Sequence, residues 1–475
     1  MTTSINVSTS RREFLAKTTA TAAALMSANP WSVAEGAAAD SPTRPKVAAV
    51  FTELRFRSHA YDILENFMGP YLFNGKLTDP GVDVVSFYAE QFPQGDMARE
   101  ASRRLGVPLF KTIGDAVCLG GKELAVDAVL SIGEHGDYPY NKLGQKMYPR
   151  KRFFDAIVAP MKRADRFVPI FNDKHLSYRW DWAKEMYDTA QRHGIPFLAG
   201  SSVPLAQRIP PIELPPEAEI EEAVSIHGGG FESYDFHGLE VLQSFVEARK
   251  GGEPGVSEVE VLSAGKLRQA LRSGRISQKL VDAAMQAEKE ANLKRRLRPS
   301  TGRRSRKGRP RKKGSRSRRA APKIRQPAAP HALALRYKDG FRATVLKVGN
   351  SANRWNFACR LRGESEPRAT ALSNGPWGNR CLFKALSHAI QHLFVTRQVP
   401  YPIERTLLVT GVLEAAVRSF NQGEKAIETP HLELGYQPID FRSMREQGGS
   451  WKIITVNTPE PPDFRPGADA RFVNH

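Results

Sequence analysis

The sequence predicts an α/β protein: a parallel-sheet N-terminal domain followed by an α+β domain with a mainly antiparallel sheet. Two observations lead to this fold class. Within 45–208, short apolar runs alternate with helical patterns, which is typical of parallel strands joined by right-handed crossovers. From 209 onward, strand-like runs follow one another with few helices between them, which favours antiparallel pairing.

The first domain opens with KVAAV and continues with the strand patterns VDVVSFYAE, AVDAVLSIG, RFVPIF and IPFLAGSS. Helical patterns such as SHAYDILENFM, MAREASRRLG and RWDWAKEMYDTAQRHG separate them. Function in such sheets gathers at the carboxyl ends of the strands. One crevice is therefore expected to collect Phe51–Arg57, Glu90, Gly133–Asp137, Asn172–His175 and Gly200–Ser202.

A proline-rich connection leads into the second domain, assigned to 209–293 and 331–460, and 461–475 is assigned to a C-terminal tail. The expected strands include SEVEVL, ALALRYKDGFRATVLKV, WNFACRLRG and HLELGYQP, and RCLFKALSHAIQHLFVT is the expected helix. Three cysteines make no disulfide framework, so stability must come from apolar burial.

Residues 1–39 resemble a twin-arginine export signal. Arg11 and Arg12 precede an Ala/Thr-rich apolar run, and small residues within 32–39 offer cleavage positions. The run is too short to span a bilayer, and no other stretch reaches about 18 apolar residues. We therefore expect an exported, periplasmic protein without a membrane span.

The net charge of +20 belongs to one segment. Residues 294–325 hold 17 of the 70 Lys and Arg and no acidic residue, which leaves 53 basic residues against 50 acidic ones elsewhere. With almost no apolar residues, 294–330 is expected to be a disordered basic insertion or the product of a local reading-frame error. No aromatic residue interrupts the segment, and an exported protein rarely meets nucleic acid, so we expect no nucleic-acid partner.

The stretch 46–208 resembles the N-terminal domain of the glucose–fructose oxidoreductase / inositol dehydrogenase family (Gfo/Idh/MocA). The order of KVAAV, RSHAYDILENF, VDVVSFYAE, AREASRRLG, VDAVLSIGEH and VPIFNDKHLSYRW carries the resemblance. It implies a Rossmann-like domain followed by an antiparallel-sheet domain. It also implies a nicotinamide-dependent oxidoreductase acting on a sugar- or polyol-like substrate.

The resemblance implies two catalytic residues, Lys174 and His237. The family's Glu-Lys-Pro motif falls on Asp173-Lys174-His175, where a lysine can bond a substrate oxygen and stabilise a developing alkoxide. The family's helix-borne histidine falls on His237, which can act as a general base. If this chemistry is retained, both residues should face one cavity. The alternatives are a solvated lysine and a structural histidine.

Other histidines offer weaker sites. His388 and His392 have the i, i+4 spacing of two metal ligands, but no third ligand accompanies them, so no metal site is predicted. His227, beside the run of glycines, is a weaker candidate for the base.

The turn that would bind the pyrophosphate of the cofactor departs most from the sequence pattern of the family. A pyrophosphate needs G-x-G-x-x-G between the first strand and helix, and here Phe51, Glu53 and Phe56 stand at the glycine positions. Two phenyl rings would fill phosphate space, and Glu53 would repel the anion. NAD or NADP is the implied cofactor, yet we expect its conventional binding to be weak or lost. Its site would be lined, by position, by Phe51, Thr52, Glu53, Arg55, Glu90, Gly133, Glu134 and Asp173.

Two other functions stay open. One is a non-catalytic descendant of the fold, serving as a carbohydrate-binding or assembly protein. The other is a polyanion-binding protein that uses the basic segment. A homo-oligomer formed through the second domain's sheet is a further expectation.

Overall fold

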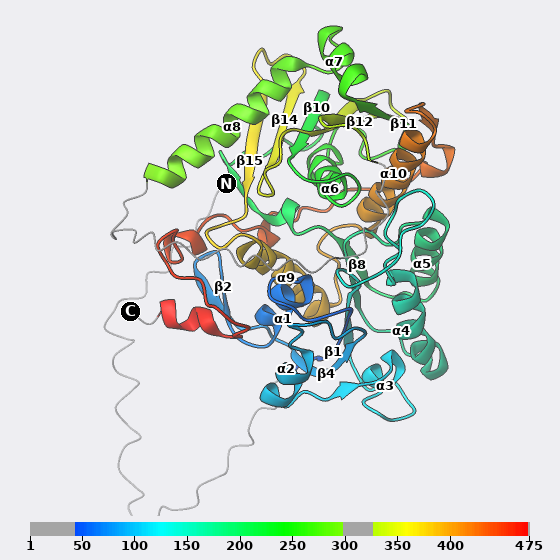
Figure 1. Ribbon diagram of the computed structural model, residues 1–475, viewed down its shortest axis with the longest axis vertical. Coiled ribbons are helices and arrows are strands. Elements are labelled where there is room, and N and C mark those ends of the chain that lie inside the picture. The colour runs from blue at the N-terminus through cyan, green and yellow to red at the C-terminus, as the bar shows by residue number, and fades with distance from the viewer. Residues whose placement is uncertain (1–42, 298–325, 474–475) are drawn as a thin grey trace, which may run out of the picture. The chain divides into compact units, whose positions relative to one another are not determined.

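The computed structural model describes residues 43–297 and 326–473 (Figure 1). The export signal predicted for 1–39 and most of the basic segment lie outside these residues, so both stay predictions. One predicted boundary is wrong, because helix α8 (Gln278–Leu297) continues into the start of the basic segment.

A six-stranded parallel sheet forms the N-terminal part, which confirms the prediction. Its strand order is β5-β4-β1-β6-β7-β8. The strands are β1 (Lys46–Phe51), β4 (Asp83–Ala89), β5 (Leu109–Phe110), β6 (Ala128–Ile132), β7 (Ile170–Asp173) and β8 (Phe197–Gly200). A hairpin of β2 (Tyr71–Phe73) and β3 (Lys76–Thr78), which the sequence did not predict, lies between the first helix and β4.

Helices cover both faces of this sheet. They are α1 (His59–Phe67), α2 (Ala98–Leu105), α3 (Ile113–Val117), α4 (Arg150–Ala164) and α5 (Trp180–Arg192). Successive residues of β1 point to opposite faces. Ala49 and Phe51 pack in the cluster that contains α1, whereas Val50 packs with apolar residues of α4. This alternation explains why β1 reads as a continuous apolar run.

An eight-stranded sheet forms the C-terminal part, in the order β16-β11-β12-β13-β10-β14-β15-β9. Every neighbouring pair is antiparallel except β10 and β13, which confirms a mainly antiparallel sheet. The strands are β9 (Gln207–Ile209), β10 (Ile220–His227), β11 (Val256–Ser263), β12 (His331–Tyr337), β13 (Arg342–Lys347), β14 (Trp355–Leu361), β15 (Arg368–Ser373) and β16 (Ile427–Glu428).

One predicted strand is wrong. The stretch HLELGYQP forms a 3-10 turn (Pro430–Leu432) followed by loop. At the edge of β11, Ile427 of β16 pairs with Val259, and within HLELGYQP only Tyr436 forms an isolated bridge, with Glu253.

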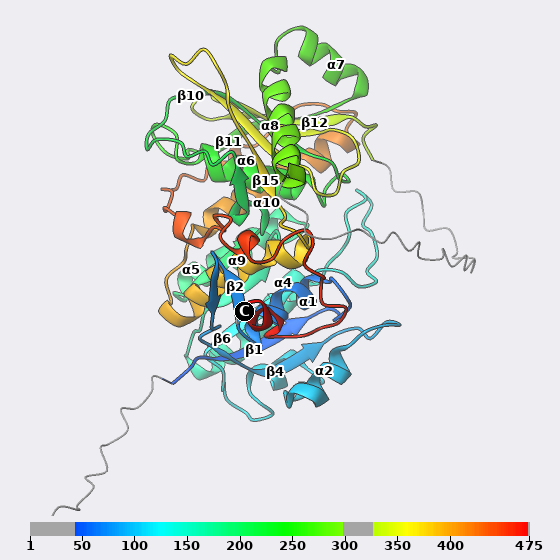
Figure 2. The same ribbon diagram turned by 90° about the vertical axis from the view of Figure 1, so that its left-hand side faces the viewer.

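Both faces of the eight-stranded sheet are covered. Helices α6 (Asp235–Val246) and α10 (Ile403–Asn421) pack on one face, and α7 (Ala264–Arg272) and α8 pack on the other. Figures 1 and 2 show α8 lying across β14 and β15. A homo-oligomer through this part, which stays a prediction, would have to use a strand edge or the outer surface of α7 and α8.

The segment after this sheet returns to the N-terminal part. Helix α9 (Asn379–Thr396) packs against α1, where Arg380 pairs with the buried Glu65. The hydroxyl of Tyr61 donates to the carbonyl oxygen of Asp463 at 2.7 Å. All residues of α1 are buried as a result.

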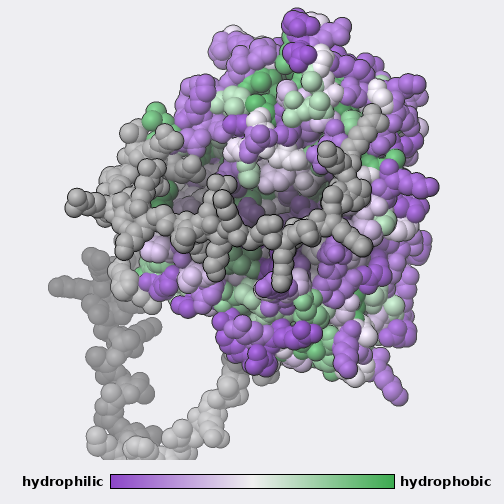
Figure 3. All heavy atoms as spheres, in the orientation of Figure 1, coloured by the Kyte–Doolittle hydropathy of each residue, from purple (hydrophilic) through white to green (hydrophobic). Residues whose placement is uncertain are grey.

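The visible face of the molecule is mostly hydrophilic, with small scattered hydrophobic areas (Figure 3). Of the described helices, none is long and apolar enough to cross a membrane.

Candidate functional site

Three parallel strands bring candidate residues to one edge of the N-terminal sheet. Strand β6 ends at Ile132, β7 at Asp173 and β8 at Gly200. Because the carboxyl ends of parallel strands share an edge, the segments that follow them meet. These segments carry Glu134, Lys174 and other predicted site residues, as the strand pattern predicts.

Lys174 belongs to a buried ionic cluster. Its ammonium lies 3.1 Å from Oε1 of Glu134, and Oε2 of Glu134 accepts a hydrogen bond from Arg150. Burial alone would raise the pKa of Glu134, but the charges of Lys174 and Arg150 hold that pKa well below its usual value. Glu134 is therefore ionised at neutral pH and holds the ammonium of Lys174 in position.

The backbone at the end of β7 is strained. Lys174 has a φ of +67°, in the left-handed region, and its N–H donates to the carbonyl oxygen of Gly200 at 3.2 Å. Gly200 itself has a φ of +134°, and a Cβ there would lie 2.8 Å from Oε2 of Glu240. The two strand ends hold each other in this geometry, and such strain concentrates at functional sites.

His175 stands where the resembled motif has proline, and hydrogen bonds immobilise it. Its Nδ1 donates to the carbonyl oxygen of Ser177 at 2.8 Å, so Nε2 is the nitrogen that accepts from Arg150 at 3.2 Å. Burial and the charge of Arg150 lower the pKa of His175 well below its usual value. The ring is therefore neutral, as this hydrogen-bond pattern requires.

Asp173 pairs with a histidine of α1. Nδ1 of His59 lies 2.6 Å from Oδ2 of Asp173, and the ring of His135 meets that of His59 edge-on at 5.0 Å. Burial and the neighbouring His59 lower the pKa of His135 to about 3. Its Nε2 is buried without a hydrogen-bond partner among the described residues. A neutral imidazole with an unused nitrogen thus lies beside the Lys174 cluster.

A cavity of about 240 Å³ opens beside Lys174. One wall is the loop 133–149, which is longer than most loop connections and so fits a binding role. The loop 228–234 also contributes to the lining of the cavity, through Phe231, Glu232 and Ser233. Pockets for drug-sized ligands measure about 300–1,000 Å³, so this cavity suits a smaller molecule. Its polar lining includes Glu134, Lys146, Tyr148, Lys174, Glu232 and Ser233.

Glu232 is the site residue that the sequence analysis missed. It lies in the cavity wall with a φ of +67°, and burial raises its pKa to about 8. It is therefore protonated at neutral pH, whereas Glu134 in the same cavity is ionised. The signal in the sequence was its place after the glycines of 228–230, but a loop glutamate is too common to single out.

His237 does not line this cavity, so the expected convergence with Lys174 is not met. Its Nδ1 lies 2.7 Å from Oγ of Ser201, and its ring packs edge-on against Trp355. Burial and the charge of Lys174 lower the pKa of His237 well below its usual value. The histidine is therefore neutral, and it lies close enough to Lys174 for that charge to lower its pKa.

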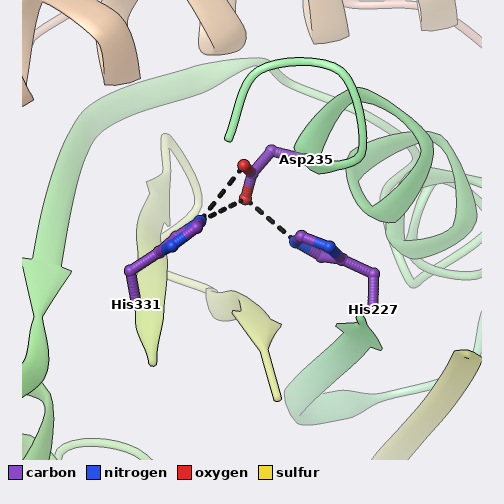
Figure 4. A group of neighbouring side chains, drawn as sticks. All are labelled: His227, Asp235 and His331. Atoms are coloured by element: carbon purple, nitrogen blue, oxygen red, sulfur yellow. Dashed lines mark hydrogen bonds and ion pairs between the residues drawn. The ribbon is translucent and has the colours of Figure 1, made fainter. Parts of the chain in front are cut away.

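A second buried cluster, His227, Asp235 and His331, lies in the C-terminal part (Figure 4). Nε2 of His227 lies 3.0 Å from Oδ1 of Asp235, and Nε2 of His331 lies 3.1 Å from the same oxygen. The three ligand atoms lie within 4.8 Å of one another, and the composition would suit zinc.

The hydrogen bonds indicate that N–H donors, rather than a metal ion, hold these three side chains together. The N–H of Gly229 donates to Nδ1 of His227 at 3.3 Å, so the proton of the neutral ring sits on Nε2, where a metal would bind. Metal-bound histidines instead donate a hydrogen bond from their second nitrogen. Burial would raise the pKa of Asp235, but the two imidazoles hold it well below its usual value. Because Asp235 also accepts the N–H of Glu232 at 3.2 Å, the cluster anchors the loop that carries Glu232.

His388, one of the two histidines at i, i+4 spacing, is held by contacts with aromatic side chains. His388 stacks on Phe73 at 4.0 Å between ring centroids, and its Nδ1 lies 3.1 Å from the hydroxyl of Tyr71.

Comparison with known proteins shows which solved structures have a similar fold. No family model and no curated protein matches the chain. Two solved structures are similar at low identity: a probable dehydrogenase from Thermotoga maritima (TM-score 0.48, 9% identity, 82% of this chain and 99% of that one) and a myo-inositol dehydrogenase from Corynebacterium glutamicum (TM-score 0.47, 11% identity, 81% and 99%). GenD2 from gentamicin A biosynthesis, in complex with NAD, matches with a TM-score of 0.50 and 11% identity over 81% of this chain and 96% of that one. The chain has the Gfo/Idh/MocA fold.

The first turn of this Gfo/Idh/MocA fold does not fit a dinucleotide pyrophosphate. Free backbone N–H groups at a helix N-terminus bind the phosphates in such sites. Here four N–H groups of the turn, those of Thr52, Leu54, Arg55 and Ser58, already donate to protein acceptors. The acceptor for Leu54, for example, is a carboxylate oxygen of Asp96 at 2.7 Å.

Two expectations about the side chains of this turn are wrong. Phe51 is wholly buried and packs edge-on against Phe87 at 5.7 Å, because it belongs to the core-facing side of β1, so its ring does not fill phosphate space. The buried carboxylate of Glu53 pairs with Arg55, 2.5 Å from its Nε, which offsets the expected repulsion. Phe56 is half exposed. The occupied backbone donors, rather than Phe51 and Glu53, oppose the pyrophosphate.

The remaining cofactor positions serve contacts within the protein. Glu90, expected to bind a ribose, pairs with Arg152 at 2.6 and 2.7 Å. A Cβ at Gly133 would lie 2.9 Å from Cγ of Arg150, so glycine lets Arg150 approach Glu134.

Proposed function

We propose that the protein binds a small sugar- or polyol-like compound in the cavity beside Lys174 and, where that compound carries a carbonyl group, transfers a proton at the carbon next to the carbonyl. The observation that carries this proposal is the pair of carboxyl groups in one cavity. Glu134 is held ionised by Lys174 and Arg150, whereas burial raises the pKa of Glu232 to about 8. Environments that separate two carboxyl groups in this way set up acid–base chemistry.

Each group then has a distinct role. Glu232 supplies or removes the proton, since its pKa lies near neutral pH. The ammonium of Lys174, held 3.1 Å from Glu134, donates to a substrate oxygen and stabilises the negative charge that develops there. Glu134 is neutralised by two cations and makes a poor nucleophile, which argues against glycosidase chemistry.

An NAD(P)-dependent oxidoreductase acting on the same ligand is the second candidate. Two observations favour it: the fold is shared with GenD2, whose structure contains NAD, and Lys174 occupies the position that the resembled family uses. The occupied backbone donors of the β1–α1 turn weigh against it. A carbohydrate-binding protein without catalysis is the third candidate.

Isotope exchange in deuterium oxide separates these functions. Sugars and polyols that raise the melting temperature are incubated with the protein, and NMR follows exchange of their carbon-bound hydrogens. Proton transfer predicts exchange that Glu232→Gln abolishes while binding persists. Binding without exchange supports the carbohydrate-binding alternative. Micromolar binding of NAD or NADP in calorimetric titration, with either redox form, supports the oxidoreductase instead.

We further propose that the protein acts outside the cytoplasm. The twin-arginine pattern of 1–39 supports this location.

A further inference from the structure

The loop 133–149 brings an unpaired cation to the cavity. Lys146 lines the cavity and is half-buried. Its Nζ donates to the carbonyl oxygen of Gly136 at 2.8 Å and lies 5.2 Å from the ring centroid of Tyr148. In the described part of the chain, no carboxylate lies within ion-pair distance of this ammonium. Its charge is therefore available to a ligand.

Positive charge is in excess around the cavity. Lys174 and Arg150 share the single carboxylate of Glu134. Glu232 adds no negative charge at neutral pH, because burial raises its pKa to about 8. Lys146 adds a further cation. Since the wall is partly buried, water screens this excess less than it would on an open surface.

We infer that the natural ligand carries a carboxylate, as an aldonate or uronate does, and that Lys146 binds it. This inference rests on the proposed function and names the substrate class of that same cavity. The protonated carboxyl of Glu232 can donate a second hydrogen bond to the carboxylate. An ammonium with a protonated acid suits one carboxylate, and charge-assisted hydrogen bonds of this kind are the strong ones.

Matched pairs of ligands test this class with the full-length protein. Calorimetric titration compares D-gluconate with D-glucitol and D-glucuronate with D-glucose, and D-glucose 6-phosphate serves as a different anion. The acids should bind about tenfold or more tightly than their neutral partners, which is the range of one charge-assisted hydrogen bond. Lys146→Met should remove this preference, so that each acid binds no more tightly than its neutral partner.

Lys142→Met is the matched control, because Lys142 lies exposed in the same loop, and it should bind like the wild type. Equal binding of acids and neutral partners, or tighter binding of the phosphate, overturns the carboxylate assignment while the proposed function stands. An acid preference that survives in Lys146→Met overturns the role of Lys146. If none of the sugars or polyols binds, the proposed function fails and this inference fails with it.

Discussion

The ammonium of Lys174 and the carboxylate of Glu134 lie 3.1 Å apart, and both side chains are buried. Arg150 completes the cluster and is also buried. Removing the carboxylate would leave two buried cations without their counter-charge.

We therefore expect Glu134→Gln to lower the free energy of unfolding by about 3–5 kcal/mol. Urea denaturation followed by circular dichroism measures the change. Glu90→Gln is the control, since it breaks an ion pair with the exposed Arg152 and should lower stability by no more than about 1 kcal/mol. Equal effects of the two variants would contradict the cluster.

Asp62 on α1 is buried, and neither carboxylate oxygen has a hydrogen-bond partner among the described residues. Burial, aided by Glu65, raises its pKa well above the usual value. A group with a raised folded-state pKa destabilises the fold above its unfolded pKa. Asp62→Asn should thus raise the melting temperature at pH 7.5 and have little effect near pH 4. A lower melting temperature at pH 7.5 would show that the carboxylate is paired in solution.

The His227–Asp235–His331 cluster should not depend on a metal. Zinc and chelators are expected to leave the melting temperature unchanged, and the purified protein should contain no stoichiometric metal. Asp235→Ala should lower stability by about 3 kcal/mol or more, since it strips two buried imidazole donors and one part-buried backbone donor of their acceptor. If the wild type contained stoichiometric zinc and Asp235→Ala lost it, the interpretation of the cluster as a metal-free hydrogen-bonded group would be refuted.

Binding of a sugar acid should weaken as the pH rises through about 8, where Glu232 ionises. The groups whose charges act on Glu232 are Arg150, Glu134 and Lys174, and it also accepts the backbone N–H of Lys146. In the Glu232→Gln variant the side chain at position 232 stays neutral, so the affinity of this variant for the sugar acid should change little between pH 6.5 and 9. Titration calorimetry at both pH values checks this, and an equal loss of affinity in wild type and variant would exclude Glu232 as the cause.

Replacing both Arg11 and Arg12 with lysine should retain the protein in the cytoplasm. Twin-arginine export depends on the arginine pair. Cell fractionation and immunoblotting would locate the protein, with Lys17→Arg as the control that keeps the pair. A periplasmic double variant would rule out this route.

The sequence predicted most of the fold because its strands are short apolar runs between clear turns. Helix α10 was missed because nearly all of its residues are buried, so its polar face is narrow and gives only a weak helical period. The strand expected at HLELGYQP failed for a tertiary reason, since β16 is the strand that pairs at the edge of β11.

The candidate site was predictable only in part. Lys174 was found from the resemblance to the family's motif, supported by its place after a strand, and its partner Glu134 was expected in the same crevice. Glu232 and Lys146 lie in loops whose course depends on contacts far along the chain. For Glu232 that contact is the cluster with His331, to which no local pattern points.

The complete burial of α1 has a consequence for biosynthesis. Helix α9 and the backbone around Asp463 cover α1, although they lie more than 300 residues downstream. While a ribosome is still making the middle of the chain, the first helix has its strands but lacks its cover. Such long-range closure slows folding and leaves apolar surface open to aggregation. We therefore expect the N-terminal part to need protection until synthesis has passed Asp463.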